Sequence, residues 1–465
     1  MSIKKTAAIA AAVAALAAVS VPAMAFENEF HGIYNIKGFV SNYENGGTAA
    51  INPLAYGETA KANNFIEQRA RLQYTAKASD DLKLVTHFEL DTKFGGDKSG
   101  KYGVSSDAGV LDADGVMIET KHVYLDFNLG KSVNVKTGIM PVTDALKGTF
   151  IDADITGILA TTKIDAATIR TGFFRYKTDT SLVTTGPTAA TATASNPVNS
   201  TQTTALETNT STIGHNNADL FLVDGKYAIN KDLNVGGLYY LNSDYSTATP
   251  VTVHVFGVTA DAKIAGATVS GFVAAQAGHS GVDSKSISAV AANVAGKLPI
   301  GPGTLKTAAL YLSGDGDTGN KHITNWQSTT VTTYAEGGMM LLARTGVGGT
   351  TNDRTITGTS FGADTYGTIL YTLGYDATIT PKLYANANAG LLWVAKSNSF
   401  NAGKKGCDLV ASEINLETGY KVYDNLTAKV QIAYDILGGI YKDQGVGGKT
   451  PENPYTGRIG LSYAF

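Results

Sequence analysis

The sequence predicts an all-β protein: a closed, antiparallel transmembrane β-barrel of about eighteen strands. Three observations lead to this prediction. Segments of about ten to fourteen residues alternate apolar with polar side chains, which is the length and pattern of a tilted strand that crosses a bilayer. Tight turns and long connections largely alternate along the chain. After residue 25, hydrophobic runs such as Met339–Ala343 reach only five residues, too short for a membrane-spanning helix.

The first element is an export signal, which does not belong to the fold. Lys4 and Lys5 form a basic start, the apolar run Ala7–Val19 follows, and Ala23-Met24-Ala25 is a small-residue cleavage site. A transmembrane anchor is the alternative, but the apolar run is shorter than a spanning helix requires. We therefore expect cleavage after Ala25, which leaves residues 26–465 as an exported barrel.

Composition excludes several other classes of protein. Glycine (52) and tyrosine (23) are abundant, proline (11) is scarce, and the formal net charge of −3 gives no basic footprint for nucleic acid. Cys407 is the single cysteine, so the chain forms no intramolecular disulfide. No arrangement of nucleophile, histidine and acid stands out among the scattered serines and histidines. We expect no enzymatic activity, no cofactor and no metal site.

Two early segments show the alternation most clearly. In "FIEQRARLQYTAKA" (residues 65–78), Ile66, Leu72 and Tyr74 fall on one face, and the charged residues fall on the other. "DLKLVTHFELDTKF" (81–94) repeats the pattern. The polar faces of the two segments carry Glu67, Arg69, Arg71, Lys83, His87, Glu89 and Asp91. In a membrane barrel such a face lines a wet lumen, while the apolar face contacts lipid.

The last segment keeps this alternation to its final residue. Ile459, Leu461, Tyr463 and Phe465 follow at two-residue spacing, so they share one face of a strand. Segments 409–422 and 426–436 before it alternate in the same way. A strand that contacts lipid along its whole length accounts for an aromatic residue at this position.

Strands placed between the connections number eighteen, with sixteen as the alternative. They are predicted at 30–43, 65–78, 81–94, 118–129, 133–140, 157–164, 167–177, 217–229, 233–245, 251–263, 267–278, 285–298, 304–314, 365–379, 383–396, 409–422, 426–436 and 455–465. The weakest signals are 157–164 and the Gly/Ala-rich stretch 251–298. The long connections, predicted to lie outside the cell, are 44–64, 95–117, 141–156, 178–216, 315–364, 397–408 and 437–454. With either number the barrel is wide enough for an aqueous channel.

Three motifs resemble those of a known family. The ending "LSYAF" is similar to the C-terminal signal that the outer-membrane assembly machinery reads, with Leu461, Tyr463 and Phe465 as its apolar residues. "FIEQRARLQY" and "HVYLDFNLGKSVNVKTGIMPV" are similar to the early arginine-bearing strand of a porin and to the strands before its constriction loop. The chain thus resembles Gram-negative outer-membrane porins of the large, phosphate-porin-like type.

The resemblance implies a water-filled channel for passive diffusion of small hydrophilic solutes or ions across the outer membrane, often as a homotrimer. Its third external loop, 141–156, would fold into the pore. Opposed charges at such a constriction set ion selectivity. The expected pore-lining residues are Glu67, Arg69, Arg71, Lys83, Glu89, Asp91, Asp144, Asp152, Asp154 and Arg170. Because this lumen mixes acidic with basic residues, strong phosphate selectivity is not expected.

Several alternatives stay open at this point. Arg69 and Arg71 could form ion pairs with Glu67 and Glu89 instead of filtering solutes. The threonine-rich stretch 178–216 and the "MMLLA" run at 339–343 could dock other surface proteins, such as extracellular redox proteins, on a structural barrel. The same run could form a short helix that plugs or braces the barrel mouth. Besides a porin and a structural barrel, a soluble, secreted β protein is the third possible class of protein.

Overall fold

The computed structural model describes residues 27–44, 62–96, 109–111, 118–178, 217–246, 250–281, 285–316, 319, 321–329, 333–343, 356, 366–396, 408–443 and 446–465. The predicted signal peptide, nearly all of the threonine-rich connection 178–216 and Cys407 lie outside these residues. The predictions made for them are therefore not tested by the structure.

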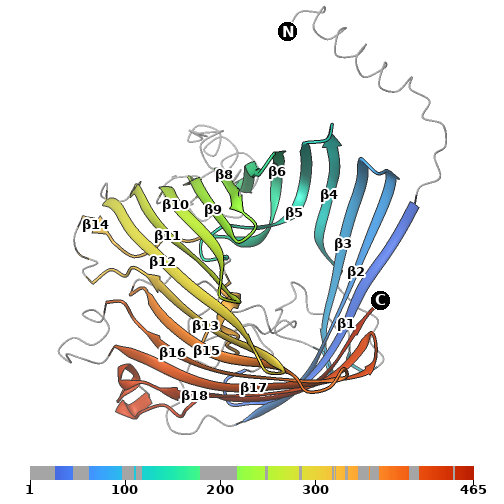
Figure 1. Cartoon of the computed structure of the whole chain (residues 1–465). Helices are drawn as coiled ribbons and strands as arrows, with labels where there is room; N and C mark the ends of the chain where they lie inside the picture. Colours follow the sequence, from blue (N-terminus) through green and yellow to red (C-terminus); the bar gives the residue numbers. More distant parts are fainter. Residues whose placement is uncertain are drawn as a thin grey trace, which may run out of the picture.

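The described residues form one antiparallel sheet that closes on itself (Figure 1). Eighteen of its nineteen strands make the wall of a barrel, and the two-residue strand β14 adds to β12 in parallel. The strands are β1 (Glu27–Ser41), β2 (Asn63–Ser79), β3 (Leu82–Lys93), β4 (Glu119–Leu129), β5 (Val133–Thr143), β6 (Asp152–Ile164), β7 (Ala167–Thr178), β8 (Asn217–Asn230), β9 (Leu233–Asp244), β10 (Val251–Ile264), β11 (Ala267–Ser280), β12 (Lys285–Ile300), β13 (Gly303–Leu312), β14 (His322–Ile323), β15 (Thr368–Thr378), β16 (Leu383–Trp393), β17 (Leu409–Tyr423), β18 (Leu426–Leu437) and β19 (Tyr455–Ala464).

The first and last wall strands close the barrel. β1 pairs with β2 on one side and with β19 on the other, and Gly32 and Phe465 exchange two backbone hydrogen bonds of 2.8 and 3.0 Å. Closure removes the unpaired strand edges that a bilayer does not tolerate. All eighteen predicted strands are confirmed, including 157–164, which is the second part of β6. The alternative of sixteen strands is wrong for this fold.

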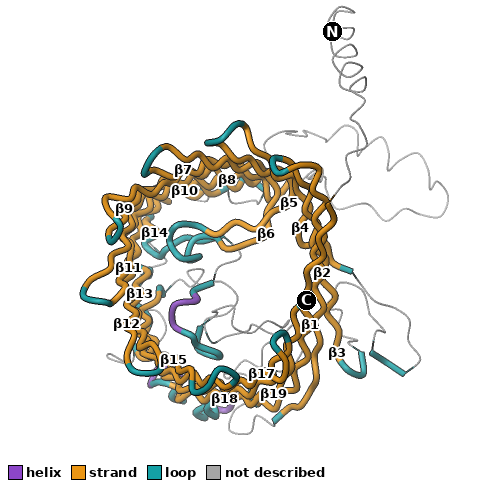
Figure 2. The backbone as a smooth tube through the Cα atoms, turned by 45° about the vertical axis from the view of Figure 1, so that its right-hand side comes forward, coloured by secondary structure: helices purple, strands orange, loops and turns teal. Residues whose placement is uncertain are grey.

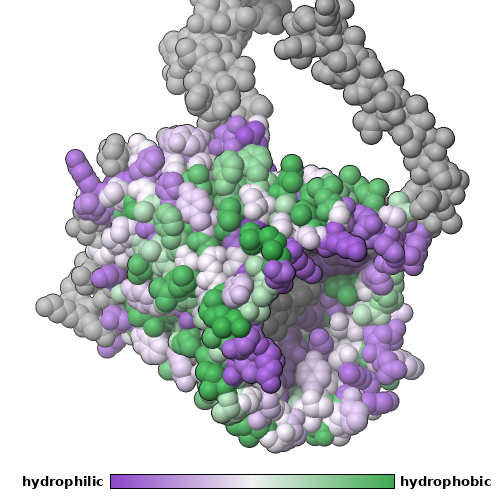
Figure 3. All heavy atoms as spheres, turned by 45° about the horizontal axis from the view of Figure 1, so that its top comes forward, coloured by the Kyte–Doolittle hydropathy of each residue, from purple (hydrophilic) through white to green (hydrophobic). Residues whose placement is uncertain are grey.

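The outer face of the barrel is apolar and the inner face polar, as the alternation predicted. On β19, Ile459 is 68% exposed and Leu461 44% exposed, whereas Arg458, which directly precedes Ile459, is buried inside. β17 repeats this pattern with Ile414 and Leu416 outside and the buried Glu413 inside. In the space-filling view, hydrophobic side chains gather on the outer surface and polar ones around a hollow at the rim (Figure 3).

The connections separate to the two ends of the barrel. Eight tight turns, such as those between β2 and β3 and between β17 and β18, lie at one end together with the two termini of the sheet. The longer connections leave and rejoin the wall strands at the other end, in agreement with the predicted alternation. Helix is limited to the 3-10 turns η1 (Ala335–Gly337), η2 (Gly439–Tyr441) and η3 (Val446–Gly448) among the described residues. None of the helices there is long and apolar enough to cross a membrane.

One hairpin, β5–β6, bends away from the wall into the lumen (Figure 2). Its pairing with β4 begins only at Ile139, and its pairing with β7 begins only at Gly157. Gly138 and Gly157 are opposite each other at this bend. Gly138 has φ +130°, and a Cβ atom there would lie 2.2 Å from the carbonyl oxygen of Val123, so only glycine fits. The connection at the hairpin tip spans 144–151, which is shorter than the predicted 141–156.

A second part of the chain also lies inside the barrel. We call residues 321–329 and 333–343 the inner segment. The sequence placed it in an external loop, yet Trp326, Tyr334 and Leu341 are fully buried among inward-facing side chains of the wall. The "MMLLA" run belongs to it and is buried too, but it forms no helix beyond the single turn η1 before it.

The inner segment explains why alternation was weak over 251–298. On β10, Val253 and Val255 face inward and Phe256 outward, so both faces of the strand are apolar. The inward residues belong to a buried cluster that includes Trp326 and the tip of the β5–β6 hairpin. Because this wall is covered by protein instead of water, it does not need polar residues.

Candidate functional site: the barrel lumen

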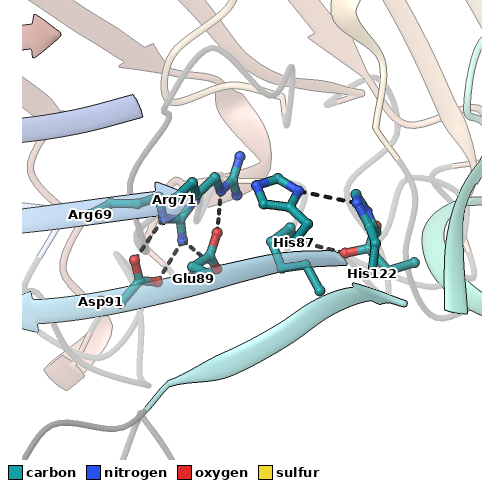
Figure 4. A network of polar contacts seen from close by, with 8 residues as sticks. Arg69, Arg71, His87, Glu89, Asp91 and His122 are labelled. Carbon is teal, nitrogen blue, oxygen red and sulfur yellow. Dashed lines mark hydrogen bonds and ion pairs between the residues drawn. The ribbon is translucent and has the colours of Figure 1, made fainter. Parts of the chain in front are cut away.

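A charged region lines the lumen on β2, β3 and β4. We call Arg69, Arg71, His87, Glu89 and Asp91, together with His122 on β4, the polar wall (Figure 4). Strict alternation places the β2 and β3 residues on the inner face, and the register pairs Arg69 with Asp91 and Arg71 with Glu89. Each arginine therefore faces a carboxylate on the neighbouring strand.

Both arginines of the polar wall form ion pairs. Arg69 donates from Nε and Nη2 to the two carboxylate oxygens of Asp91 at 2.7 and 2.6 Å, and its Nη2 lies 3.4 Å from Glu89. Arg71 donates from Nε to Glu89. The bidentate geometry of Arg69 with Asp91 is the strong form of such a pair. The pairing interpretation of Arg69 and Arg71 fits this geometry, although Asp91 takes the place expected for Glu67.

A second set of contacts connects the wall to the hairpin. The Nδ1 atoms of His87 and His122 lie 3.1 Å apart, and His122 Nε2 lies 2.8 Å from Asp154 on β6. Lys121 Nζ donates to the other oxygen of Asp154 at 2.8 Å. Asp154 thus ties the inward hairpin to β4.

Asp144 acts inside the hairpin tip and is not free in the pore. Its carboxylate is buried and accepts four backbone hydrogen bonds of 2.6–2.8 Å, from Leu146, Gly148, Phe150 and Ile151. Burial raises the pKa of this carboxyl to about 6, and the four N–H donors limit the rise. The ionised side chain therefore holds the tip in one shape at neutral pH.

We expect Asp144→Ala to destabilise the hairpin strongly. The substitution leaves four buried N–H groups without an acceptor, and each such group costs about 1–3 kcal/mol when water cannot reach it. The free energy of unfolding, measured with urea on the detergent-solubilised protein, should therefore fall by at least about 2 kcal/mol. Asp232→Ala, in an exposed tight turn, is the control and should lie within about 0.5 kcal/mol of the unchanged protein. Equal losses in both variants would contradict this role of Asp144.

The hairpin tip and the inner segment contact each other at several points. Trp326 Nε1 donates to the carbonyl oxygen of Thr149 at 3.2 Å, and Lys147 Nζ forms an ion pair of 2.6 Å with Glu336. Asp152 accepts from Thr143 at 2.6 Å and also from Thr333 of the inner segment. Asp152 therefore joins the two inner structures, so neither it nor Asp144 is a free pore charge.

Glu413 holds the inner segment on the opposite wall. Its carboxylate accepts hydrogen bonds from the backbone N–H groups of Met340, Leu341 and Leu342 at 2.6–2.9 Å, and from Asn415 at 2.6 Å. A carboxylate with several N–H donors is a strong anchor. The "MMLLA" run is thereby fixed to β17 inside the barrel.

The remaining predicted residues are also paired or buried. Arg170 makes a bidentate pair with Asp224 at 2.8 and 2.6 Å and reaches the carbonyl oxygen of Thr143 at 3.2 Å. Lys83 Nζ lies 3.5 Å from Asp126. Glu67 is fully buried on the inner face of β2. The lumen thus has the mixed charge that the sequence predicted, with most of it neutralised locally.

Sequence reasoning missed three features of this site. His87 and His122 are 35 positions apart, so no motif spacing marks them as neighbours. Glu413 lies in the predicted strand 409–422, but nothing in that strand shows that it binds a distant part of the chain. The covered inner wall could have been recognised from the loss of alternation at 251–298, because only a lumen filled with protein permits apolar residues there.

Comparison with known proteins supports the fold. No protein-family model matches the chain, and no curated protein sequence matches it. Among solved structures, OccK9 (OpdG) of Pseudomonas aeruginosa is similar with 14% identity and a TM-score of 0.54, over 94% of this chain and 98% of that one. OccAB2 of Acinetobacter baumannii gives 12% and 0.54, again over 94% and 98%. The outer membrane protein OpdK of P. aeruginosa, solved with vanillate, gives 11% and 0.53 over the same shares. At these identities the likeness establishes the barrel fold alone.

Proposed function

We propose that the chain is an outer-membrane porin, a channel through which small hydrophilic solutes or ions diffuse passively. The observation that carries this proposal is the reversed polarity of the barrel. Leucine, isoleucine and aromatic side chains cover the outside, while ionised side chains such as Arg69 and Asp91 face the inside. This distribution suits a hydrocarbon solvent outside and a wet lumen inside. The proposal assigns no catalytic step to the protein.

The permeant solutes are proposed to be selected mainly by size. The hairpin tip 144–151 and the inner segment occupy the side of the lumen next to β7–β17, so the path runs along the polar wall. There each arginine is paired with a carboxylate, so the wall attracts neither anions nor cations strongly. OpdK was solved with the carboxylate vanillate, but in this chain we propose weak selectivity and no dedicated phosphate or carboxylate filter.

The location and assembly follow from the same proposal. An exported barrel with an apolar exterior belongs in the outer membrane, and its closing strand, with Leu461, Tyr463 and Phe465 outward, fits recognition by the assembly machinery. We also propose that the protein forms a homotrimer, because the porins that it resembles often do. Fractionation tests the location: the protein should stay with outer membranes and leave them only with detergent.

Single-channel recording tests the function. Purified protein added to a planar bilayer should produce discrete conductance steps that scale with the concentration of KCl, because a water-filled path conducts in proportion to bulk ions. Heat-unfolded protein at the same detergent concentration is the control and should give none. A correctly folded barrel that never opens would overturn the channel proposal.

A second candidate is a structural barrel that docks other surface proteins. One observation favours it, namely that the inner segment and hairpin fill a large part of the lumen with buried apolar side chains such as Trp326 and Phe150. Silent insertion into the bilayer, together with a crosslinked surface protein in intact membranes, would support this candidate over the channel.

A further inference from the structure

The two histidines of the polar wall stand directly opposite each other on neighbouring strands. The register pairs His87 on β3 with His122 on β4. Their ring centroids are 4.9 Å apart with planes at 57°, and their Nδ1 atoms are 3.1 Å apart. If both rings are neutral, there are two arrangements at this distance. Either one Nδ1 carries a proton and donates it to the other Nδ1, or both Nδ1 atoms direct a lone pair into the space between the rings.

The distance between the two Nδ1 atoms matches that of two imidazole ligands on one metal ion. Imidazole nitrogens bind Zn²⁺ at about 2.0–2.1 Å, so two of them on one ion at tetrahedral or square-planar angles lie roughly 2.8–3.4 Å apart. The observed separation falls in this interval without any movement of the backbone. We propose that His87 and His122 bind one divalent transition-metal ion, of the Zn²⁺ class, through their Nδ1 atoms.

Asp154 prepares His122 for this role. The Asp154 carboxylate lies 2.8 Å from His122 Nε2, so that nitrogen carries the proton and Nδ1 keeps its lone pair toward His87. Without metal, His87 donates its Nδ1 proton to His122. When the ion binds, His87 takes the tautomer protonated at Nε2, so no proton needs to leave the pair. A carboxylate behind a metal-binding histidine is the usual support of such ligands.

The surrounding charges permit a cation. The two nearest basic side chains, Lys121 and Arg71, are each held by a carboxylate, Asp154 and Glu89 respectively. Glu119 lies opposite Glu89 on the neighbouring strand and adds a further acidic group. The neighbourhood is therefore not positive overall, and a divalent ion is not repelled.

The chemistry of the ligands sets selectivity and strength. Imidazole suits Zn²⁺, Cu²⁺ and Ni²⁺, whereas Ca²⁺ and Mg²⁺ prefer oxygen ligands. Among the described residues, no group of three or more His, Cys, Asp or Glu is placed to hold a metal. Water would complete the coordination, so the site binds reversibly, with micromolar instead of nanomolar affinity.

Zinc titration of the full-length protein in detergent tests the proposal, with calorimetry at pH 7.5 and Zn²⁺ alone as the probe. We expect one site, weakened at least tenfold by His87→Ala and by His122→Ala. Asp154→Asn should weaken it about 10–100-fold while leaving both ligands in place. His254→Ala is the matched control, because His254 contacts Tyr239 on β9, away from this site, and should leave affinity unchanged.

Two results would overturn the proposal: no saturable Zn²⁺ binding, or binding that His87→Ala and His122→Ala leave unchanged. If these variants do not fold, crystals of the unchanged protein soaked in ZnCl₂ give the answer. An anomalous peak between the two Nδ1 atoms supports the site, and a peak only elsewhere refutes it. Because binding is measured without conductance, failure of the channel proposal would not affect this test.

Discussion

Removal of the inner segment should raise single-channel conductance at least about twofold, since eighteen strands alone enclose an aqueous channel. Leu312 of β13 and Thr368 of β15 are partners in the sheet, so a linker of about four Gly and Ser residues can replace residues 314–366. The barrel wall stays complete in this variant. Conductance in 1 M KCl, compared with that of the unchanged protein, measures the effect.

Two matched variants show whether the inner segment is the obstruction. Glu413→Ala removes the acceptor of three backbone N–H groups, so the run at Met340–Leu342 should detach at times. We expect current fluctuations toward the larger conductance of the deletion variant. Glu417→Ala, four residues along the same inner face, bonds only wall residues and should give steady current. Unaltered conductance after the deletion would mean that ions pass elsewhere.

The inner segment also shows where sequence reasoning reaches its limit. Alternation is a local property, so it located all eighteen strands, even where the signal of β6 was weak. The position of the inner segment depends on contacts between distant residues, such as Trp326 with Thr149, 177 positions apart. No periodic pattern within 321–343 reports such partners, and the segment was therefore placed outside.

Asp144 illustrates an error that local reasoning could have avoided. A carboxylate in a loop was expected to be free in the pore, because the resemblance suggested a charged constriction. Yet Asp commonly accepts the N–H of a residue two positions on, and Leu146 supplies that donor. With Gly148 two positions further, the turn could have been read from the sequence. The spacing of Asp144 and Gly148 thus predicts a turn in which the Asp144 carboxylate accepts backbone hydrogen bonds.

The ion pairs of the polar wall could be assigned only once the register of the sheet was known. The sequence showed that Arg69 and Arg71 share a face, but not which carboxylates oppose them. A shift of two residues would have paired Arg69 with Glu89 instead of Asp91. Because the register leaves each arginine neutralised, the difference bears directly on selectivity.

Replacement of Arg69 by Ala should make the channel cation-selective. The change leaves Asp91 and part of Glu89 with unbalanced negative charge in the lumen, where rings of charge control ion passage. In a tenfold KCl gradient at low salt, the reversal potential should move toward that of K⁺, since screening is weak there. Stability should fall by about 3–5 kcal/mol, because a buried carboxylate loses its partner.

The double variant Arg69→Ala/Asp91→Ala separates charge from structure. It removes the pair as a whole, so the lumen returns to its original net charge and the reversal potential should return with it. Arg175→Ala is the second control. Arg175 has an exposed side chain that pairs with the half-buried Asp219 and lies over the ring of Phe173 on the outer face, outside the conduction path. Its loss should leave the reversal potential unchanged. If Arg69→Ala also leaves it unchanged while the protein conducts, ions do not pass along the polar wall, and the path proposed for this lumen is wrong.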